Sequence, residues 1–322
     1  MPVHAFIFPG QGSQALGMGR DLAEAFAAAR EVFEEVDDAL GERLTRVMWG
    51  EDAEALTLTA NAQPALMAVS LASLRVLEAE GGFRLADRAV LVAGHSLGEY
   101  SALAAAGAFG IAQAARLLRV RGEAMQAAVA PGIGAMAALL GVELEAAGEI
   151  CAEAAKVPDE AGGGSELVSV ANDNGGGQVV ISGLRGAVER AIAIAKARGV
   201  KRAVLLPVSA PFHCALMAPA AEAMEAALDS SPPVAPKVPL IANVTAQRVQ
   251  EPGEIADLLV RQVTGAVRWR ESLLAAGAIG VDSFVELGSG KVLSGLVRRV
   301  LPDAQALAAG TPTEIESLLK AL

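Results

Sequence analysis

The sequence predicts an α/β fold, in which helices cover both faces of a mostly parallel sheet and a smaller unit interrupts the chain. Three observations lead to this prediction. Short apolar runs typical of buried strands alternate with longer segments of helical periodicity over most of the 322 residues. Between Pro131 and Pro207 this alternation gives way to the order βαββαβ. Hydrophobic residues make up 53% of the chain, which is enough for a sizeable core.

The first half of the chain contains two expected strands that each lead into a glycine-containing loop. Ala5–Phe8 ends in PGQGSQ, and Val90–Ala93 runs into GHSLG. Helical stretches separate and follow these strands, and we expect them around 21–40, 63–79, 99–106 and 111–129. After the middle of the chain the alternation returns, with strands near 238–242 and 282–287 and helices near 254–263, 289–300 and 313–321.

The middle of the chain reads as a separate unit. Strands are expected at 134–141, 167–171, 178–182 and 202–206, and helices at 143–155 and 184–198. This order is that of the split-βαβ, ferredoxin-like unit, and a glycine-rich loop at 161–165 lies within it. We therefore expect a large α/β domain of residues 1–131 and 207–322 and an inserted subdomain of residues 132–206.

Composition excludes several classes of function. The net charge of −11 argues against nucleic-acid binding, which favours a basic surface. No apolar stretch of about 18 residues is present, and the N-terminus lacks the features of a signal peptide, so we expect no membrane segment. Cys151 and Cys214 make no disulfide framework, and with three histidines the chain offers no clear zinc site. These features fit a reducing, cytoplasmic location.

The turn GHSLG matches the G-x-S-x-G nucleophile elbow, in which a strand turns sharply into a helix and exposes a serine hydroxyl. Glycines at 94 and 98 keep side chains away from the tight turn and from an approaching substrate. The sequence around the motif also predicts the strand and the helix that it requires. Ser96 is therefore a candidate nucleophile; the alternative is a serine that only caps the helix.

A serine nucleophile needs a base, and the chain offers His4, His95 and His213. His95 is adjacent to Ser96, and its side chain leaves the backbone in a different direction. His4 lies at the start of the first strand, away from the carboxyl edge where such sites are built. His213 follows a strand in the loop VSAPFH and is the remaining candidate. The alternative is a packed histidine beside a buried cysteine.

The loop FPGQGSQ fits a role in binding an oxyanion. Its G-x-G-x-x-A pattern loosely matches a dinucleotide loop, but a helix follows where that motif needs a second strand and an acid. ELGSGKVL likewise lacks the spacing of a P-loop. In serine acyl enzymes, one oxyanion N–H comes from a loop after a neighbouring strand and one from the residue after the serine. Gln11 and Leu97 occupy these places.

Arg121 is expected on the apolar face of the helix at 111–129. It shares that face with Leu117, Leu118 and Met125. A buried guanidinium is costly unless it is paired. It could await a substrate carboxylate, which its planar fork binds with two hydrogen bonds. Alternatively, internal carboxylates or carbonyls could satisfy it.

Seven segments, spread in order along the whole chain, resemble the malonyl-CoA:acyl carrier protein transacylase family. They are FPGQGSQ, GHSLGEY, RGEAMQ, NDN with GQVVISG, VSAPFH, LVRQV and VELGSGKVL. The resemblance implies an α/β-hydrolase-like large domain with a ferredoxin-like subdomain. It also implies transfer of a malonyl group from malonyl-CoA to the phosphopantetheine thiol of acyl carrier protein, in fatty acid biosynthesis. No metal and no bound cofactor are implied, and a monomer is favoured.

Position by position, the resemblance implies that Ser96 takes the malonyl group, His213 acts as the base and Arg121 binds the malonyl carboxylate. Gln11 and Leu97 would form the oxyanion hole.

The main-chain carbonyl of Gln262 would orient the histidine, in place of a triad aspartate. Asn174 matches an asparagine that faces the active site, although Gly175, Gly176 and Gly177 replace the Ser-Pro-Gly of many relatives. Phe212 resembles the malonyl-selective pattern.

Three alternatives remain at this point. A serine esterase or lipase would share the elbow without needing Arg121, and it would follow the serine with an acid and a histidine. An acyltransferase domain of a polyketide synthase would use similar chemistry. A carrier-binding scaffold would keep the fold without the reaction.

Overall fold

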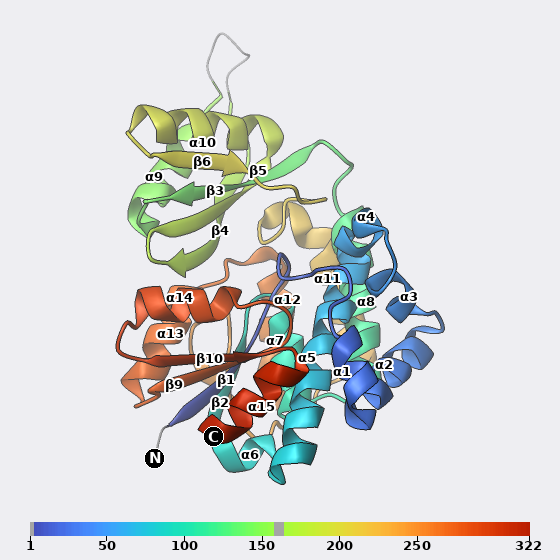
Figure 1. The fold of residues 1–322 in the computed structure, drawn as a ribbon. Helices are drawn as coiled ribbons and strands as arrows, with labels where there is room; N and C mark the ends of the chain where they lie inside the picture. The colour runs from blue at the N-terminus through green and yellow to red at the C-terminus, as the bar shows by residue number, and fades with distance from the viewer. Residues whose placement is uncertain (1–2, 158–163) are drawn as a thin grey trace.

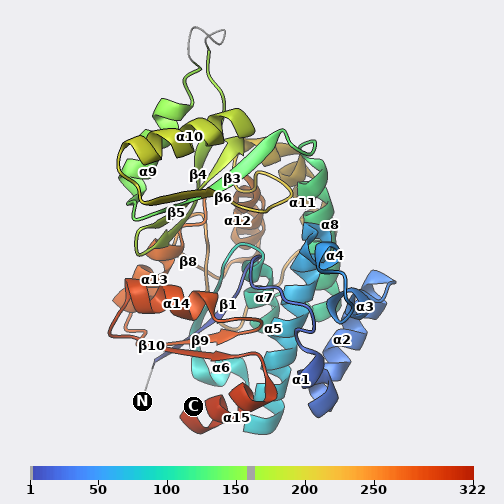
Figure 2. The same ribbon diagram turned by 45° about the horizontal axis from the view of Figure 1, so that its top comes forward.

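The computed structural model describes residues 3–157 and 164–322. Most of the glycine-rich loop expected at 161–165 therefore lies outside the described residues. Within them the chain forms a six-stranded sheet and a four-stranded sheet, each with helices packed against it. The four-stranded sheet lies above the larger one in Figure 1, and Figure 2 shows the same two parts from a tilted view.

The six-stranded sheet has the order β10-β9-β1-β2-β7-β8. Its strands are β1 (His4–Phe8), β2 (Ala89–Gly94), β7 (Leu240–Ile241), β8 (Arg248–Val249), β9 (Ser283–Leu287) and β10 (Gln305–Ala309). All neighbouring pairs are parallel except β7 and β8. Because parallel neighbours end at the same edge of a sheet, the loops after β1 and β2 meet there. This arrangement brings PGQGSQ beside GHSLG.

Helices cover both faces of this sheet. Along β1, Phe6 and Phe8 face one core, whereas Ala5 and Ile7 face the other, as strand geometry requires. The helices that contribute to the first core or surround it are α1 (Arg20–Ala25), α2 (Ala27–Leu40), α3 (Leu44–Met48), α4 (Ala53–Thr57), α5 (Thr59–Gly81), α6 (Leu85–Arg88), α7 (Gly98–Ala105), α8 (Ile111–Ala127), α11 (Ala218–Ser230), α12 (Pro252–Thr264) and α15 (Pro312–Ala321). The second core lies under α13 (Trp269–Ala278) and α14 (Val292–Val300).

The four-stranded sheet is antiparallel, with the order β4-β5-β3-β6. In chain order its elements are β3 (Gly134–Leu140), α9 (Leu144–Ala154), β4 (Val168–Gly175), β5 (Gln178–Leu184), α10 (Arg185–Ala197) and β6 (Arg202–Leu205). Helices α9 and α10 share a core with one face of the sheet. On the other face, Met136, Ala138 and Val180 join the core of the larger part.

The structure differs from the sequence prediction in a few elements. The stretch around 21–40 forms two helices, because Phe26 is extended (φ −130°, ψ 127°) and its N–H closes α1 on the carbonyl of Leu22. The strand expected near 238–242 has only two residues, Leu240 and Ile241. The sequence did not predict the longer helices α11 and α13, the short helices α3, α4 and α6, or the strands β8 and β10. Strand β10 is at the sheet edge and mostly half-exposed, so it lacks the apolar run of a buried strand.

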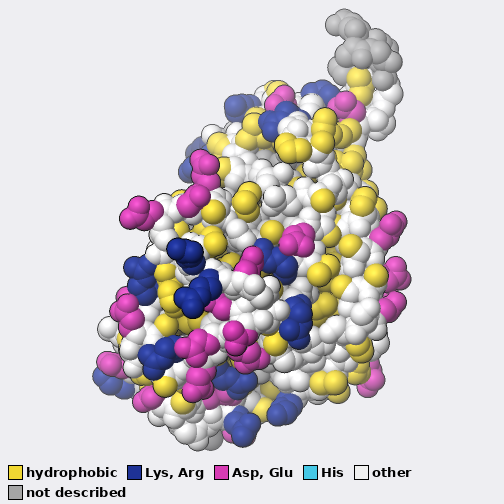
Figure 3. Space-filling model, turned by 90° about the vertical axis from the view of Figure 1, so that its right-hand side faces the viewer, with side chains coloured by type: hydrophobic (Ala, Val, Ile, Leu, Met, Phe, Trp, Pro, Cys, Tyr) yellow, Lys and Arg dark blue, Asp and Glu magenta, His cyan; other side chains and the backbone are white. Residues whose placement is uncertain are grey.

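The surface carries charges of both signs. On the face shown in Figure 3, Lys and Arg side chains are interspersed with Asp and Glu, so the negative net charge is not gathered there. None of the helices in the described part of the chain combines the length and apolar character needed to cross a membrane.

Candidate active site

A sharp turn between β2 and α7 holds Ser96, whose φ of 55° lies in the left-handed region. Gly94 and Gly98 make this turn possible. A Cβ on Gly94 would lie 1.9 Å from main-chain atoms of Gly98, and a Cβ on Gly98 would lie 2.2 Å from the carbonyl oxygen of Phe8. The side chain of Asn243 also holds the turn, since it accepts the Ser96 N–H at 2.8 Å and donates to the carbonyl of Gly94 at 2.7 Å.

The hydroxyl of Ser96 lies beside His213. Ser96 Oγ and His213 Nε2 are 2.8 Å apart. On the other side of the ring, Nδ1 lies 2.9 Å from the carbonyl oxygen of Gln262 and 3.1 Å from that of Gly265. Main-chain acceptors thus fix Nδ1 as the protonated nitrogen and leave Nε2 free to accept a proton. Among the described residues, no carboxylate bonds to this ring.

Burial keeps His213 neutral. The side chain is only 4% exposed. Desolvation first, and then the nearby charge of Arg121, lower its pKa to about 3, although the two carbonyl contacts act in the opposite direction. A neutral imidazole next to a serine hydroxyl is the protonation state that a general base requires.

Arg121 reaches the same hydroxyl from α8. Nη1 donates to Gln63 Oε1 at 2.7 Å, and Nη2 donates to Gln262 Oε1 at 2.7 Å and to Ser96 Oγ at 3.2 Å. The guanidinium is 1% exposed, and its Nε has no partner among the described residues. Its hydrogen-bond partners are two side-chain amide oxygens and a hydroxyl, so no carboxylate among the described residues neutralises its charge by direct contact.

Gln11 lies on the loop after β1, and Leu97 lies in the turn after β2, next to Ser96 in the sequence. Both residues line the cleft that contains Ser96. The side chain of Gln11 is held by the hydroxyl of Thr59 at 2.9 Å. Among the described residues, no main-chain hydrogen bond uses the N–H of Gln11 or of Leu97. Two N–H groups at the carboxyl edge of the sheet are therefore available to an incoming oxygen.

The cleft has a volume of about 620 Å³ and lies between the two sheets. The small sheet contributes Asn174 from the end of β4, whose Oδ1 lies 2.9 Å from His95 Nε2. The segment between β6 and α11 contributes Phe212 and His213. The site therefore depends on both parts of the molecule.

Comparisons with known proteins show the family to which the chain belongs. The acyl transferase domain family matches residues 5–311. The malonyl CoA-acyl carrier protein transacylase of Bacillus subtilis (strain 168) is 45% identical, and the alignment covers 99% of this chain and 96% of that protein. The chain belongs to the malonyl-CoA:acyl carrier protein transacylase family.

Solved structures of related transacylases have the same fold. An acyl-carrier-protein S-malonyltransferase from Bartonella henselae superposes with a TM-score of 0.94 at 56% identity, covering 99% of both chains. A malonyl-transacylase solved in complex with its type II PKS acyl-carrier protein superposes with a TM-score of 0.93 at 41% identity, covering 99% of this chain and 100% of that one.

Sequence reasoning missed three polar residues of this transacylase site, namely Gln63, Glu99 and Asn243. All three are at most 1% exposed, and each bonds to Ser96, Arg121 or Gln262. Helical spacing could have drawn attention to Gln63, because it lies among buried residues on α5. For Asn243, which follows a two-residue strand, the sequence offers no comparable signal.

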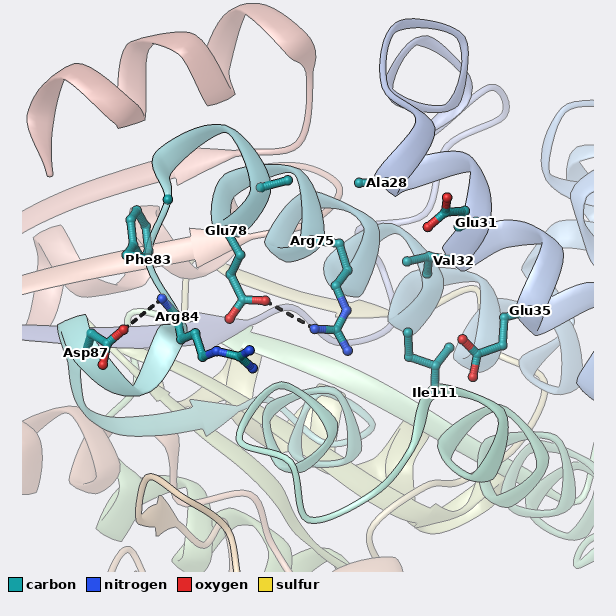
Figure 4. Close-up of a pocket in the computed structure, with 12 residues that line it drawn as sticks. Ala28, Glu31, Val32, Glu35, Arg75, Glu78, Phe83, Arg84, Asp87 and Ile111 are labelled. Atoms are coloured by element: carbon teal, nitrogen blue, oxygen red, sulfur yellow. Dashed lines mark hydrogen bonds and ion pairs between the residues drawn. The ribbon is translucent and has the colours of Figure 1, made fainter.

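A second hollow, of about 790 Å³, shares no lining residue with the Ser96 cleft of the transacylase. Several of its charged groups have partners within the chain (Figure 4): Arg75 pairs with Glu78 at 3.2 Å, and Asp87 accepts the main-chain N–H of Arg84. Glu35 accepts the N–H of Ala112 at the start of α8. Nowhere in the described residues do three or more His, Cys, Asp or Glu side chains form a group that could hold a metal ion.

Proposed function

We propose that this transacylase moves the malonyl group of malonyl-CoA to the phosphopantetheine thiol of acyl carrier protein, through a malonyl ester on Ser96, in fatty acid biosynthesis. The observation that carries the proposal is the convergence on one hydroxyl. Ser96 Oγ lies 2.8 Å from the neutral Nε2 of His213 and 3.2 Å from the guanidinium of Arg121. A nucleophile, its base and a site for a carboxylate therefore meet within one cleft.

In the first half-reaction, His213 Nε2 takes the proton of the Ser96 hydroxyl while Oγ attacks the thioester carbonyl. The carbonyl oxygen gains negative charge and is stabilised by the N–H groups of Gln11 and Leu97. The C–S bond then breaks, and the proton on His213 passes to the departing CoA sulfur. The carbonyl of Gln262 stabilises the histidine cation during this step.

In the second half-reaction, the thiol of the carrier protein gives its proton to His213, and its sulfur attacks the malonyl ester. The C–O bond breaks, and the proton returns to Ser96 Oγ. The carboxylate of the malonyl group stays on Arg121 through both halves, where the fork geometry provides two parallel hydrogen bonds. Asn174 holds His95 against the nucleophile turn.

We also propose a domain assignment for this fold. We assign residues 1–131 and 207–322 to an α/β-hydrolase-like domain and residues 132–206 to a ferredoxin-like subdomain. The order β3-α9-β4-β5-α10-β6 supports the second assignment. Malonyl-CoA and acyl carrier protein are the proposed partners, and the chain is proposed to act as a monomer.

Intact-protein mass spectrometry after brief exposure to malonyl-CoA tests the proposal. One malonyl mass should appear and should map to the peptide containing GHSLGEY, and holo carrier protein should then remove it. The Ser96→Ala variant should gain no mass. Acylation that persists in Ser96→Ala, or loss of the acyl group to water at the rate seen with the carrier protein, would contradict a transferase acting through this serine.

A further inference from the structure

Glu99 is a buried acid that the proposed mechanism does not use. It lies in the first turn of α7, three residues after Ser96, and is 1% exposed. Its carboxyl group receives two donors: Oε1 accepts the main-chain N–H of Asn243 at 2.9 Å, and Oε2 accepts a short hydrogen bond from Gln262 Nε2. Among the described residues, Asn243 and Gln262 are the two whose side chains hydrogen-bond to the backbone of Ser96.

The hydrogen bonds of Gln262 require one orientation of its side-chain amide. Nε2 donates to Glu99 and to the carbonyl of Ser96 at 2.9 Å, whereas Oε1 accepts from Arg121 at 2.7 Å. If the amide were reversed, its oxygen would face a carboxylate and a carbonyl, and its NH₂ would face a guanidinium. All three contacts would become repulsive. Glu99 accepts a hydrogen bond from Nε2 and thereby keeps Oε1 turned toward Arg121. The position of the Arg121 guanidinium thus depends on Glu99.

We propose that Glu99 is the positioning residue for malonyl recognition: through the Gln262 amide it holds the Arg121 guanidinium in the orientation that receives the substrate carboxylate. This inference rests on the proposed function and adds a residue that touches neither substrate nor the reacting atoms. It explains why an acid is placed deep behind the nucleophile, where burial is costly.

The charges around Glu99 fit this role. Burial raises the pKa of Glu99 to about 8, while the bonds from Asn243 and Gln262 and the charge of Arg121 act in the opposite direction. Glu99 is thus close to the balance between its charged and neutral forms near physiological pH. Both forms keep oxygen atoms facing the two donors, so the carboxyl group maintains the orientation of the amide in either state.

The Glu99→Gln variant tests the proposal, because an amide offers one acceptor oxygen to two donors. We expect acylation by malonyl-CoA to fall by about tenfold to a hundredfold, as for a lost hydrogen bond in a charged network. Acylation by acetyl-CoA, which does not use Arg121, should fall less, so the malonyl-to-acetyl ratio should drop about tenfold. In an Arg121→Ala background, Glu99→Gln should leave the ratio unchanged, because the two residues act in one chain of contacts.

Glu286 provides a matched control. It is also fully buried and accepts two N–H groups, from Leu293 and Ser294, but among the described residues it makes no hydrogen bond to Gln262 or Arg121. Glu286→Gln should lower the unfolding temperature as Glu99→Gln does and leave the ratio as in the unmodified chain. Glu99→Asp keeps two acceptor oxygens on a shorter side chain, so its ratio should be intermediate. This variant keeps the test available if Glu99→Gln does not fold.

Three outcomes separate the possibilities. A parallel loss of malonyl and acetyl transfer in the Glu99 variants would mean a merely structural role and overturn the proposal. The proposal would also be overturned if Glu99→Gln and Arg121→Ala had additive effects on the malonyl-to-acetyl ratio. An unmodified chain that malonyl-CoA does not acylate would instead refute the proposed function.

Discussion

Arg121 is a permanently charged residue that is only 1% exposed. Gln63 and Gln262 hold the guanidinium by its two terminal nitrogens, and neither amide neutralises it. A malonyl carboxylate would provide the missing negative charge, whereas an acetyl group would leave the cation unpaired. On the proposed function, we therefore predict that Arg121 determines the choice between malonyl and acetyl substrates.

The Arg121→Ala variant should lose most malonyl transfer, while acetyl transfer holds or rises. Breaking a buried charge pair costs about 3–5 kcal/mol, which corresponds to roughly 10²–10³-fold in the malonyl-to-acetyl ratio. Arg121→Lys should rescue poorly, because one ammonium group cannot reproduce the two-bond fork. Rates with both acyl-CoA substrates should be measured side by side. An unchanged ratio in Arg121→Ala would mean that the arginine is structural.

His213 makes the fold sensitive to acid. Its pKa falls from the usual 6.5 to about 3 in the folded chain, mainly because of burial. Between these values the unfolded chain binds a proton that the folded chain does not, so stability decreases as the pH falls below 6.5. At pH 5 the loss should be about 2 kcal/mol relative to pH 7. His213→Gln should not show this part of the decline in urea unfolding at the two pH values. An identical decline in both proteins would contradict the burial argument.

At the scale of elements, the site depends on how closely α7 approaches β1. Gly98 begins the helix with its α-carbon facing the carbonyl of Phe8, and Gly94 ends the preceding strand against Gly98. The absence of side chains at these positions lets the strand turn directly into the helix, which raises Ser96 above the sheet edge.

Gly98→Ala should destabilise the chain by about 1–3 kcal/mol, because the new methyl group would lie 2.2 Å from a main-chain oxygen. The same shift would move Ser96 away from His213, so acylation should nearly disappear. Gly148→Ala is the control, since that helical glycine has open space around it and should gain about 1 kcal/mol. Thermal unfolding and acylation of both variants check the prediction, which fails if Gly98→Ala remains as active and stable as Gly148→Ala.

At the scale of the whole molecule, the cleft exists because the small sheet is fastened to the large part beside the nucleophile. The N–H of Asp173 bonds to the carbonyl of Val267, and its carboxylate bonds to Arg270 Nε at 2.8 Å. The next residue, Asn174, then contacts His95. The position of the small sheet thus affects the turn that holds Ser96, through the contact of Asn174 with His95.

Arg270→Ala would leave the buried carboxylate of Asp173 with one partner fewer, at a cost of about 1–3 kcal/mol. We expect a several-fold decrease in kcat/KM for malonyl-CoA as the small sheet loosens. The ion pair of exposed Arg75 with half-buried Glu78 lies outside the cleft, so Arg75→Ala should change stability and activity little. Equal effects of the two substitutions on kcat/KM would show that the Asp173 contact does not shape the cleft.

Much of this molecule follows from local patterns. The spacing of GHSLG dictates the elbow, and helical periodicity alone places Arg121 with Leu117, Leu118 and Met125 on the buried side of α8. The βαββαβ order likewise comes from runs of apolar residues, and the structure has elements of that order over Gly134–Leu205. These features depend on neighbours within a few turns or strand residues, which a sequence displays directly.

The tertiary structure alone decided which distant groups surround the nucleophile. Asn243 and Gln262 reach Ser96 across 147 and 166 residues, because Asn243 follows β7, which pairs with β2, and Gln262 lies near the carboxyl end of α12. The role of Glu99 as an acceptor for both of them was likewise invisible, since a glutamate in the first turn of a helix ordinarily faces solvent. The order of the strands in the sheet determines such contacts, and no local pattern encodes that order.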